Sequence, residues 1–548
     1  MLLLLVGVAV GAAAPADAHE APTPEDGTDG GRGGTEPLCA FDHPEWRSPT
    51  FIAGVRIGED PSCRPDNPAV VAAVTKGTNN VDSEVLARTG LHDEAVVKRT
   101  DADGDGDPDV IHVTLEIMGL NEYNATGATH AIAPGIRPAF WVFAPKTRGM
   151  LEQNAPATRL VRMPSPPLRV EAGDRVKLTV ENTHYLPHTL HLHGVDHPYM
   201  VNGSGNDGVP QTSEKPILPG ESRTYEFTPR QPGTMYYHCH VVPSVHVTMG
   251  LNGMFVVARN RSENYVQTIN VGAGRVRHPS KAIRRNYTAA YDLHYQAVDK
   301  ELHRIPQRYN DPRVVARRTN RVYDRTNATP DYFLLNGRSF PYTLRESMVI
   351  VQPDERYRLR ILNGGSETVS LHTHGHKVTV EAKDGVSLSE DEEVVRDVVT
   401  LTAAQRLDVT LNTTNDGLHS YGQGVWFLHD HREEAVTTDG ISPGGDVSLI
   451  VYRNFLRADG MPVTETNLSQ YFSTAYYEGE IPFWRDLDAK HLGAPPGTPD
   501  RTTHLRLPRR DRVPIWMRPG TLAVIGLLGM LVFLGLMGGL LYRGGETS

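Results

Sequence analysis

The chain has 548 residues, which is too long for one ordinary domain and predicts at least two domains with extensions. Its formal net charge of -10 is mild for this length, and no long basic tract is present, so nothing predicts a nucleic acid partner. With 24 histidines against 3 cysteines, the composition excludes a disulfide-dense scaffold and raises the question of what the imidazoles do.

The N-terminal segment predicts export. An apolar run at 2–13 precedes small residues at 16–18, as is typical of a signal peptide, so we interpret residues 1–18 as a cleaved leader. Residues 19–109 then form an N-terminal extension. In an oxidising compartment we expect its two cysteines, Cys39 and Cys63, to form a disulfide.

The extension ends in a run of carboxylates separated by glycine turns. Such a run either wraps a calcium ion or forms a plain acidic turn, and both interpretations stay open, because the glutamate that closes a helix-loop-helix calcium site is missing. The candidate ligands are Asp101, Asp103, Asp105, Asp107 and Asp109.

Two later regions show short strands with alternating apolar residues, separated by glycine and proline turns. They predict an all-β chain with one β-sandwich at 110–261 and a related one at 331–455. The arginine-rich segment 262–330, with few periodic apolar positions, is predicted as a linker, and the proline-containing segment 456–520 as a stalk.

The segment 521–542 is predicted as a C-terminal transmembrane helix. It is apolar and uncharged, it is rich in glycine, and at about 1.5 Å per residue it is long enough to cross a bilayer. Together with the leader, it predicts a protein at the cell surface, anchored by this helix with both sandwiches outside the cytoplasm.

The histidines occur in pairs at i and i+2, which place two imidazoles on the same side of a strand. Chance yields roughly one such pair at this histidine content. Each sandwich carries one pair before its middle strands and one near its end, a pattern that favours metal binding over separate structural roles. The five pairs are 191/193, 238/240, 372/374, 374/376 and 429/431. We assign His376, the overlapping member, a structural or supporting role.

The cysteine Cys239 lies between His238 and His240, and His246 follows seven residues later. A thiolate with two imidazoles is the ligand set of a blue copper site, and His188 is the plausible second imidazole. A cysteine beside a histidine is, by itself, equally compatible with zinc binding or an inert thiol. The surrounding histidine pairs favour copper.

The motif His-x-x-His-x-His-Gly, followed later by His-Cys-His and a downstream histidine, resembles the blue copper domain of multicopper oxidases. The resemblance covers roughly residues 110–455 and implies two cupredoxin-like Greek-key domains. It implies four coppers per subunit, with His188, Cys239 and His246 at the type 1 copper. It also implies His191 and His372 at the type 2 copper, and six type 3 ligands: His193, His238, His240, His374, His429 and His431.

Two departures from the family pattern are informative. The spacing from His240 to His246 is two residues wider than usual, and the axial position falls on Leu251, which cannot coordinate, with Met249 as the alternative. The later sandwich has Asp430 where a cysteine would be needed. The chain therefore resembles the two-domain members of the family, which implies a homotrimer with clusters shared between neighbouring subunits.

The resemblance implies a laccase-like reaction, in which a phenol, amine or metal ion donates electrons and O2 is reduced to water. By motif position, Asp207 and Glu433 match the family's acidic residues and are candidates to supply protons, although each is equally compatible with a solvated loop carboxylate. Two alternatives remain: a copper nitrite reductase, and a surface copper or electron-transfer protein without oxygen chemistry. Copper content and oxygen uptake distinguish them.

Overall fold

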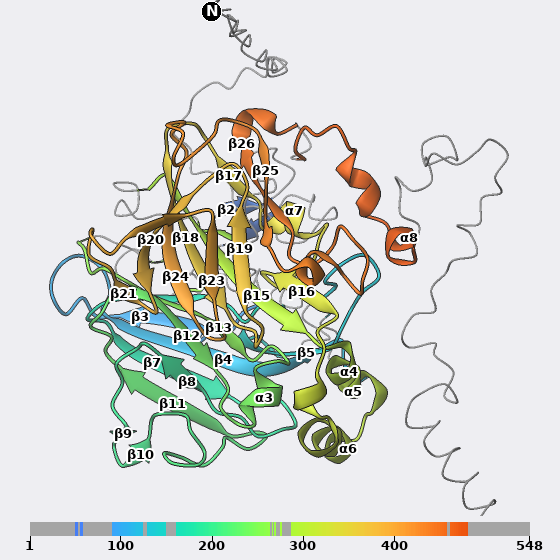
Figure 1. Cartoon of the computed structure of the whole chain (residues 1–548). Helices are drawn as coiled ribbons and strands as arrows, with labels where there is room; N and C mark the ends of the chain where they lie inside the picture. The colour runs from blue at the N-terminus through green and yellow to red at the C-terminus, as the bar shows by residue number, and fades with distance from the viewer. Residues whose placement is uncertain are drawn as a thin grey trace, which may run out of the picture. The chain divides into compact units, whose positions relative to one another are not determined.

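The computed structural model describes residues 50–52, 55–57, 90–123, 129–149, 161–262, 266, 268–269, 274–276, 287–457 and 461–479. Two β-sandwiches account for most of these residues (Figure 1). The predicted leader (1–18), the Cys39–Cys63 disulfide and the predicted membrane helix (521–542) lie outside the described residues. Within the described residues, no helix is long and apolar enough to cross a membrane.

The first sandwich packs a five-stranded sheet against a four-stranded sheet. In spatial order, the five-stranded sheet contains β11 (Ser222–Phe227), β7 (Arg175–Glu181), β4 (Val110–Leu120) and β3 (Val96–Arg99), with β5 (Phe140–Pro145) beside β4. The four-stranded sheet contains β6 (Leu168–Glu171), β13 (Asn252–Ala258), β12 (Gly233–His238) and β8 (His191–His193). In β7 every second side chain is buried, as period-2 alternation predicts for a strand with one face on the core.

The second sandwich packs an eight-stranded sheet against a five-stranded one. The larger sheet contains β14 (Gly274–Val276), β15 (Ala289–Val298), β18 (Arg356–Asn363), β24 (Arg406–Asn412), β20 (Val378–Lys383) and β21 (Val386–Ser387), with β16 (Tyr332–Leu335) beside β15 and β22 (Val394–Arg396) beside β20. The smaller sheet contains β17 (Val349–Val351), β26 (Ser448–Tyr452), β25 (Val425–Asp430), β19 (Val369–Thr373) and β23 (Val398–Leu401).

The two sandwiches repeat the same strand pairing. In the first, β4 pairs with β7 in parallel and β6 with β13 in parallel. In the second, β15 pairs with β18 and β17 with β26, again in parallel. The strands that carry the histidine pairs, β8 with β12 and β19 with β25, are antiparallel neighbours in both. The predicted relation between the sandwiches therefore extends to their topology.

The segment 262–330 is more than the linker that the sequence predicted. It contains β15, every residue of which is buried between neighbouring strands. The polar side chains of this strand contact the first sandwich: Arg169 forms a buried ion pair with Asp292, and Gln296 accepts a hydrogen bond from Asn252 at 3.2 Å. The sequence analysis missed this strand because its polar side chains are typical of a solvent-exposed face. In the structure that face forms part of the interface between the sandwiches.

Shorter elements complete the described chain. The predicted N-terminal extension contributes β3 to the first sandwich and the hairpin of β1 (Thr50–Ile52) and β2 (Val55–Ile57). A second ribbon pairs β9 (Met200–Val201) with β10 (Ser204–Gly205). Among the described residues, the α-helices are α3 (Pro243–His246), α4 (Lys300–His303), α5 (Ile305–Arg308), α6 (Pro312–Arg317), α7 (Thr343–Glu346) and α8 (Thr474–Tyr477).

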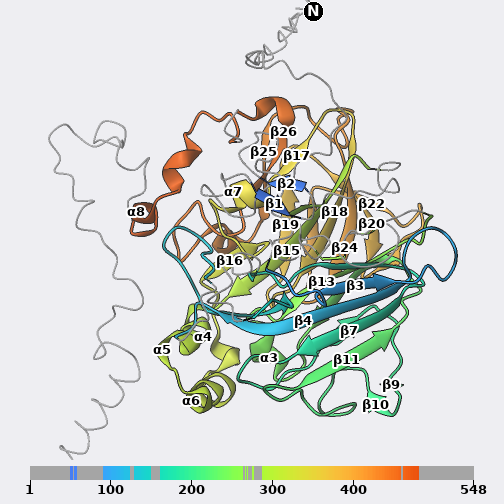
Figure 2. The same cartoon turned by 180° about the vertical axis from the view of Figure 1, so that it is seen from behind.

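The helices α4 to α6 lie beside the first sandwich, as both views show (Figures 1 and 2). The ring of His303 accordingly contacts the backbone oxygens of Ala139 and Thr248, at 2.5 and 3.1 Å. The described start of the predicted stalk is also packed: Tyr476 donates a hydrogen bond to the Pro443 carbonyl at 2.7 Å. That part of the stalk prediction was wrong, because the segment is rich in tyrosines that bury against the second sandwich.

Candidate metal centres

Three donor atoms converge in the core of the first sandwich. The Cys239 sulfur lies 3.6 Å from Nδ1 of His188 and 3.3 Å from Nδ1 of His246. All three residues are buried. Cys239 directly follows β12, and its amide donates to the Leu251 carbonyl at 3.0 Å. These three are the residues that the sequence predicted as one ligand set.

The loop after the cysteine is the place where the sequence is two residues longer than expected. It folds into the short helix α3, which ends at His246 and begins after Val242, a residue in the left-handed region at φ 43°. A β-branched residue rarely adopts this conformation, so the surrounding loop holds the backbone there. Leu251 and Met249 are both buried beside this loop. The turn thus returns His246 to the cysteine in spite of the extra length.

Burial keeps the three donors neutral when no cation is present. It raises the pKa of the Cys239 thiol to about 12 and lowers the pKa of His246 to about 3. It also lowers the pKa of His188 well below its ordinary value, with the neighbouring His246 and His184 adding to the effect. A thiolate in this environment requires a bound cation to be stable, as metal-coordinated thiols are.

The outer nitrogens of the two imidazoles have different surroundings. Nε2 of His188 lies 2.9 Å from Nδ1 of His184, whereas Nε2 of His246 is buried without a hydrogen bond partner. The ring of His246 packs edge to face with that of Trp141. Farther out, Glu122 accepts a hydrogen bond from Trp141 at 2.7 Å. Sequence reasoning missed these supporting residues; the only signal for His184 was its position four residues before His188.

A second set of histidines lies on the adjacent strands β8 and β12. His191 and His238 are direct partners across the two strands, and the rings of His191 and His240 lie 5.3 Å apart. Nε2 of His193 lies 2.9 Å from Nε2 of His238. His238 and His240 flank Cys239 in sequence, so this set joins the first through single peptide bonds. The i, i+2 pairs therefore do present their imidazoles to one region.

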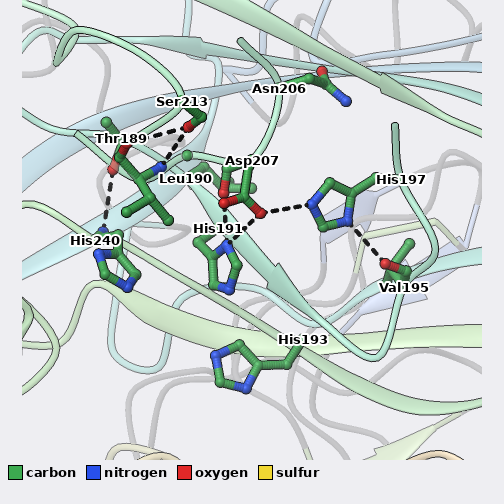
Figure 3. Close-up of polar contacts among 12 residues, drawn as sticks. Thr189, Leu190, His191, His193, Val195, His197, Asn206, Asp207, Ser213 and His240 are labelled. Atoms are coloured by element: carbon green, nitrogen blue, oxygen red, sulfur yellow. Dashed lines mark hydrogen bonds and ion pairs between the residues drawn. The ribbon is translucent and has the colours of Figure 1, made fainter. Parts of the chain in front are cut away.

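An acidic residue holds one ring of this set. Nδ1 of His191 hydrogen-bonds the backbone oxygen of Asp207 at 2.6 Å and lies 3.4 Å from its carboxylate (Figure 3). The same carboxylate lies 3.0 Å from Nε2 of His197, so it bridges two imidazoles. His197 was not predicted from the sequence. The hydrogen bond at Nδ1 directs the opposite nitrogen of His191 toward the other histidines.

The second sandwich contains a matching set on β19 and β25. His372 and His429 are direct cross-strand partners, and Nε2 of His374 lies 3.1 Å from Nε2 of His429. Backbone oxygens again hold the outer nitrogens, Asp397 for His372 at 3.0 Å and Asp430 for His429 at 2.9 Å. The ring of His431 lies 5.4 Å from that of His372. The four histidines repeat the arrangement of the first sandwich.

The residue between His429 and His431 is the buried Asp430. Its carboxylate accepts hydrogen bonds from the Arg432 side chain at 2.9–3.0 Å and from the Ser370 amide at 3.0 Å. Asp430, held by these bonds, stands at the position where a second blue copper would need its cysteine ligand. The prediction that only the first sandwich has the thiolate set is consistent with this geometry.

Within the described residues, the two histidine sets do not meet. No ring contact and no group of convergent donor atoms joins a histidine of the first sandwich with one of the second. The second set lies at the surface: His431 is exposed, and the neighbouring Phe427 is 46% exposed. Each set is therefore half of any site that needs all eight imidazoles.

The other predicted residues lie outside these sets. Glu433 is exposed at the start of a 3-10 helix (Glu433–Val436), and among the described residues it makes no hydrogen bond to the histidines. His376 is buried against Tyr452, with Nε2 3.0 Å from the hydroxyl. In the acidic loop, carboxylate oxygens of Asp101, Asp103 and Asp109 lie within 4.8 Å of one another.

Comparison with known proteins places this geometry in context. Two stretches match family models described as multicopper oxidase, residues 158–262 and 308–438. An iron transport multicopper oxidase of Gibberella zeae is 26% identical over 53% of the chain and 44% of its own length. A laccase of Cryphonectria parasitica is 27% identical over 48% of the chain and 38% of its own length. The chain thus spans less than half the length of these relatives.

Solved structures also match. A blue copper oxidase from Nitrosomonas europaea is 26% identical, with a TM-score of 0.45, over 63% of this chain and 86% of that one. A multicopper oxidase named mgLAC is 24% identical, with a TM-score of 0.46, over 67% of this chain and 95% of that one.

Proposed function

We propose that this chain, which belongs to the multicopper oxidase family, couples one-electron oxidation of a reducing substrate to four-electron reduction of O2 to water. The observation that carries the proposal is the link between Cys239 and its two neighbours: the thiol lies in one donor set, while His238 and His240 lie in the next.

The first donor set fits a type 1 copper. Bonds of about 2.0 Å to nitrogen and 2.3 Å to sulfur at 120° separate the donors by about 3.7 Å, close to the 3.3 and 3.6 Å observed. One thiolate with two imidazoles is the blue copper combination. We propose His188, Cys239 and His246 as the ligands, with Leu251 at the axial position without coordinating and Met249 as the alternative.

The two histidine sets fit a trinuclear copper cluster. Backbone oxygens hold Nδ1 of His191, His238, His372 and His429 and leave the opposite nitrogens free to coordinate. We propose His191 and His372 as type 2 ligands, with six type 3 ligands: His193, His238, His240, His374, His429 and His431. When bound, the coppers supply the redox chemistry that accepts single electrons and delivers four to O2.

The chain itself provides the path between the sites. From the Cys239 sulfur, covalent bonds lead through the backbone to His238 on one side and to His240 on the other. The backbone oxygen of Cys239 also contacts Nδ1 of His238 at 2.8 Å, which adds a hydrogen-bonded shortcut. The path is fixed because β12 and the Leu251 hydrogen bond hold this segment.

Reduction of O2 to water consumes protons, and Asp207 is the better placed of the two predicted acids. Its carboxylate lies between His191 and His197, at 3.4 and 3.0 Å. We propose that it holds a proton at this edge of the cluster. Glu433 is a candidate for the same role on the second sandwich, once that face is covered by a partner.

We propose that the complete cluster forms between subunits of a homotrimer, with the first set of one chain meeting the second set of its neighbour. Support comes from the separation of the sets in one chain and from two exposed apolar side chains beside the second set, Phe427 and Val398. A cyclic assembly satisfies every half-site with one kind of interface.

We also propose that the protein is exported and held at the cell surface by the predicted helix at 521–542. Calcium binding by the acidic loop stays a prediction.

The proposed oxidase activity is tested on the copper-loaded full chain in detergent by metal analysis, electron paramagnetic resonance and oxygen uptake. About four coppers per chain are expected, with the blue signal absent in Cys239→Ser. About two coppers with nitrite reduction, or one copper without oxygen uptake, contradicts it.

A further inference from the structure

The loop that carries Asp207 lies directly against the backbone at the start of β8. Gly208 has a φ of 79°, and a Cβ atom at this position would lie 2.0 Å from the carbonyl oxygen of Leu190. A glycine is needed here because any side chain would meet both the positive φ and the neighbouring backbone. At this close approach the Asp207 carbonyl oxygen lies 2.6 Å from Nδ1 of His191, and its carboxylate lies between His191 and His197 (Figure 3).

A single carboxylate connects the two backbones at this point. The side chain of Glu214 is fully buried and accepts hydrogen bonds at both of its oxygens. Its Oε2 accepts from the Gly208 amide at 3.0 Å, and its Oε1 accepts from the Tyr225 hydroxyl at 2.7 Å. The Tyr225 oxygen in turn accepts from the Leu190 amide at 3.0 Å. Three hydrogen bonds therefore join Gly208 to Leu190.

The surroundings hold this carboxylate in one orientation. The Ser213 amide donates to the Val209 carbonyl at 2.9 Å, and this turn returns Glu214 toward the start of the loop. Tyr225 is buried on β11, and Nε of Arg223 on the same strand lies 3.3 Å from Oε1 of Glu214. Among the described residues, neither Glu214 nor Tyr225 forms a hydrogen bond or a ring contact with a histidine. Any effect on the histidines therefore passes through the backbone.

We propose that Glu214 and Tyr225 are positioning residues that set the separation between Asp207 and His191. The inference rests on the proposed function, in which Asp207 holds a proton and His191 binds the type 2 copper. A carboxylate accepts hydrogen bonds at both oxygens, whereas the amide of glutamine accepts at only one. Glu214→Gln thus breaks one connection at constant side-chain size, and Tyr225→Phe removes only the connection to Leu190.

The connection is tested without metal, by hydrogen exchange of single amides in the copper-free full chain. Tyr225→Phe is expected to raise the exchange rate of the Leu190 amide about tenfold and to leave that of the Gly208 amide unchanged. Glu214→Gln is expected to raise at least one of these two rates by about the same factor. Unchanged rates at both amides in both variants overturn the proposal.

A matched control comes from the same part of the chain. Glu221 also accepts a hydrogen bond from a backbone amide, that of Leu218 at 3.0 Å, but it is exposed. Glu221→Gln is therefore expected to leave the exchange rates of the Gly208 and Leu190 amides at their wild-type values.

The effect on the site is tested on the copper-loaded full chain by electron paramagnetic resonance and oxygen uptake. Glu214→Gln and Tyr225→Phe are expected to change the hyperfine splitting of the type 2 copper, because the hydrogen bond at His191 shifts, and to leave the blue signal unchanged. Each variant is expected to lower kcat about fivefold, and the double variant no further, because the two side chains form one connection.

The outcomes separate the positioning role from the oxidase function. If the losses of kcat multiply in the double variant, or if an active variant keeps the wild-type type 2 signal, the pair only supports the fold and the proposal is overturned. If exchange rises as expected but the wild type takes up no oxygen, the oxidase function has failed and the positioning of Asp207 against His191 stands.

Discussion

The division of eight imidazoles into two separate sets allows a complementation experiment with a calculable result. One variant loses the first set through His191→Ala and His193→Ala, and the other loses the second set through His372→Ala and His374→Ala. Each variant alone is expected to be inactive, because every cluster in the proposed trimer would lack two ligands. The two are then co-expressed in equal amounts with different affinity tags.

In a trimer with shared clusters, a complete site needs an intact first set from one chain and an intact second set from its neighbour. Each requirement is met with a probability of one half, so about one quarter of the clusters are complete after random mixing. Wild type co-expressed with the first variant gives about one half, because only one requirement varies. If each cluster instead formed within a single chain, mixing the variants would restore none.

The assay is oxygen uptake per chain in the fraction that carries both tags, with electron paramagnetic resonance to count type 2 copper. In every trimer that carries both tags, one of the three clusters is complete, so recovery near one third in this fraction, with about one half in the wild-type control, supports shared clusters. Doubly tagged trimers that remain as inactive as either variant alone refute the reasoning.

Three further predictions concern potential, stability and pH. Leu251→Met supplies a thioether near the thiolate set and is expected to lower the reduction potential of the proposed blue copper, measured by redox titration. An unchanged potential would mean that Leu251 is not at the axial position. Arg169→Met removes the closer partner of the buried Asp292 carboxylate and leaves only Arg360, at 3.9 Å, at a cost of about 3 kcal/mol in the free energy of unfolding, measured by urea titration; Asp292→Asn in the same chain is expected to recover most of it. Burial raises the pKa of Asp174 to about 7, so the folded chain binds more protons than the unfolded chain between roughly pH 4 and 7, and this contribution to stability is lost as pH rises through that window. Asp174→Asn is therefore expected to lessen the fall in unfolding free energy from pH 5 to pH 7, whereas Glu465→Gln leaves it unchanged, and equal slopes in both variants contradict the assignment.

The grouping of the paired histidines was predictable because a strand has a period of two. Any pair at i and i+2 presents both side chains to the same side, so the histidine pairs could be assigned to common regions without knowing the fold. The cross-strand register of His191 with His238, and of His372 with His429, required the structure. The separation of the two sets was implied only by the family resemblance, since the distance between the sandwiches leaves no local pattern in the sequence.

Other features were hidden for identifiable physical reasons. Strand β15 carries Asp292, His294 and Gln296 on one face, which reads as a polar surface until the other sandwich covers it. Glu122 lies far from the copper motif in sequence and reaches His184 only through the packing of the five-stranded sheet. Interfaces and supporting contacts of this kind depend on which elements become neighbours, information that no short stretch of the chain contains.

The replacement of a thiol by Asp430 makes the repeated halves unequal. Both sandwiches carry histidine sets, but only in the first does a thiol, that of Cys239, offer a covalent path for electrons to the histidines. In the second sandwich Asp430 is hydrogen-bonded to Arg432 and offers no second path. In the proposed trimer, each cluster therefore receives electrons through the chain that supplies its first histidine set, whereas the neighbouring chain supplies only ligands. The trimer would then contain three independent electron-transfer paths. Loss of one Cys239 thiol would inactivate one cluster and leave the other two active.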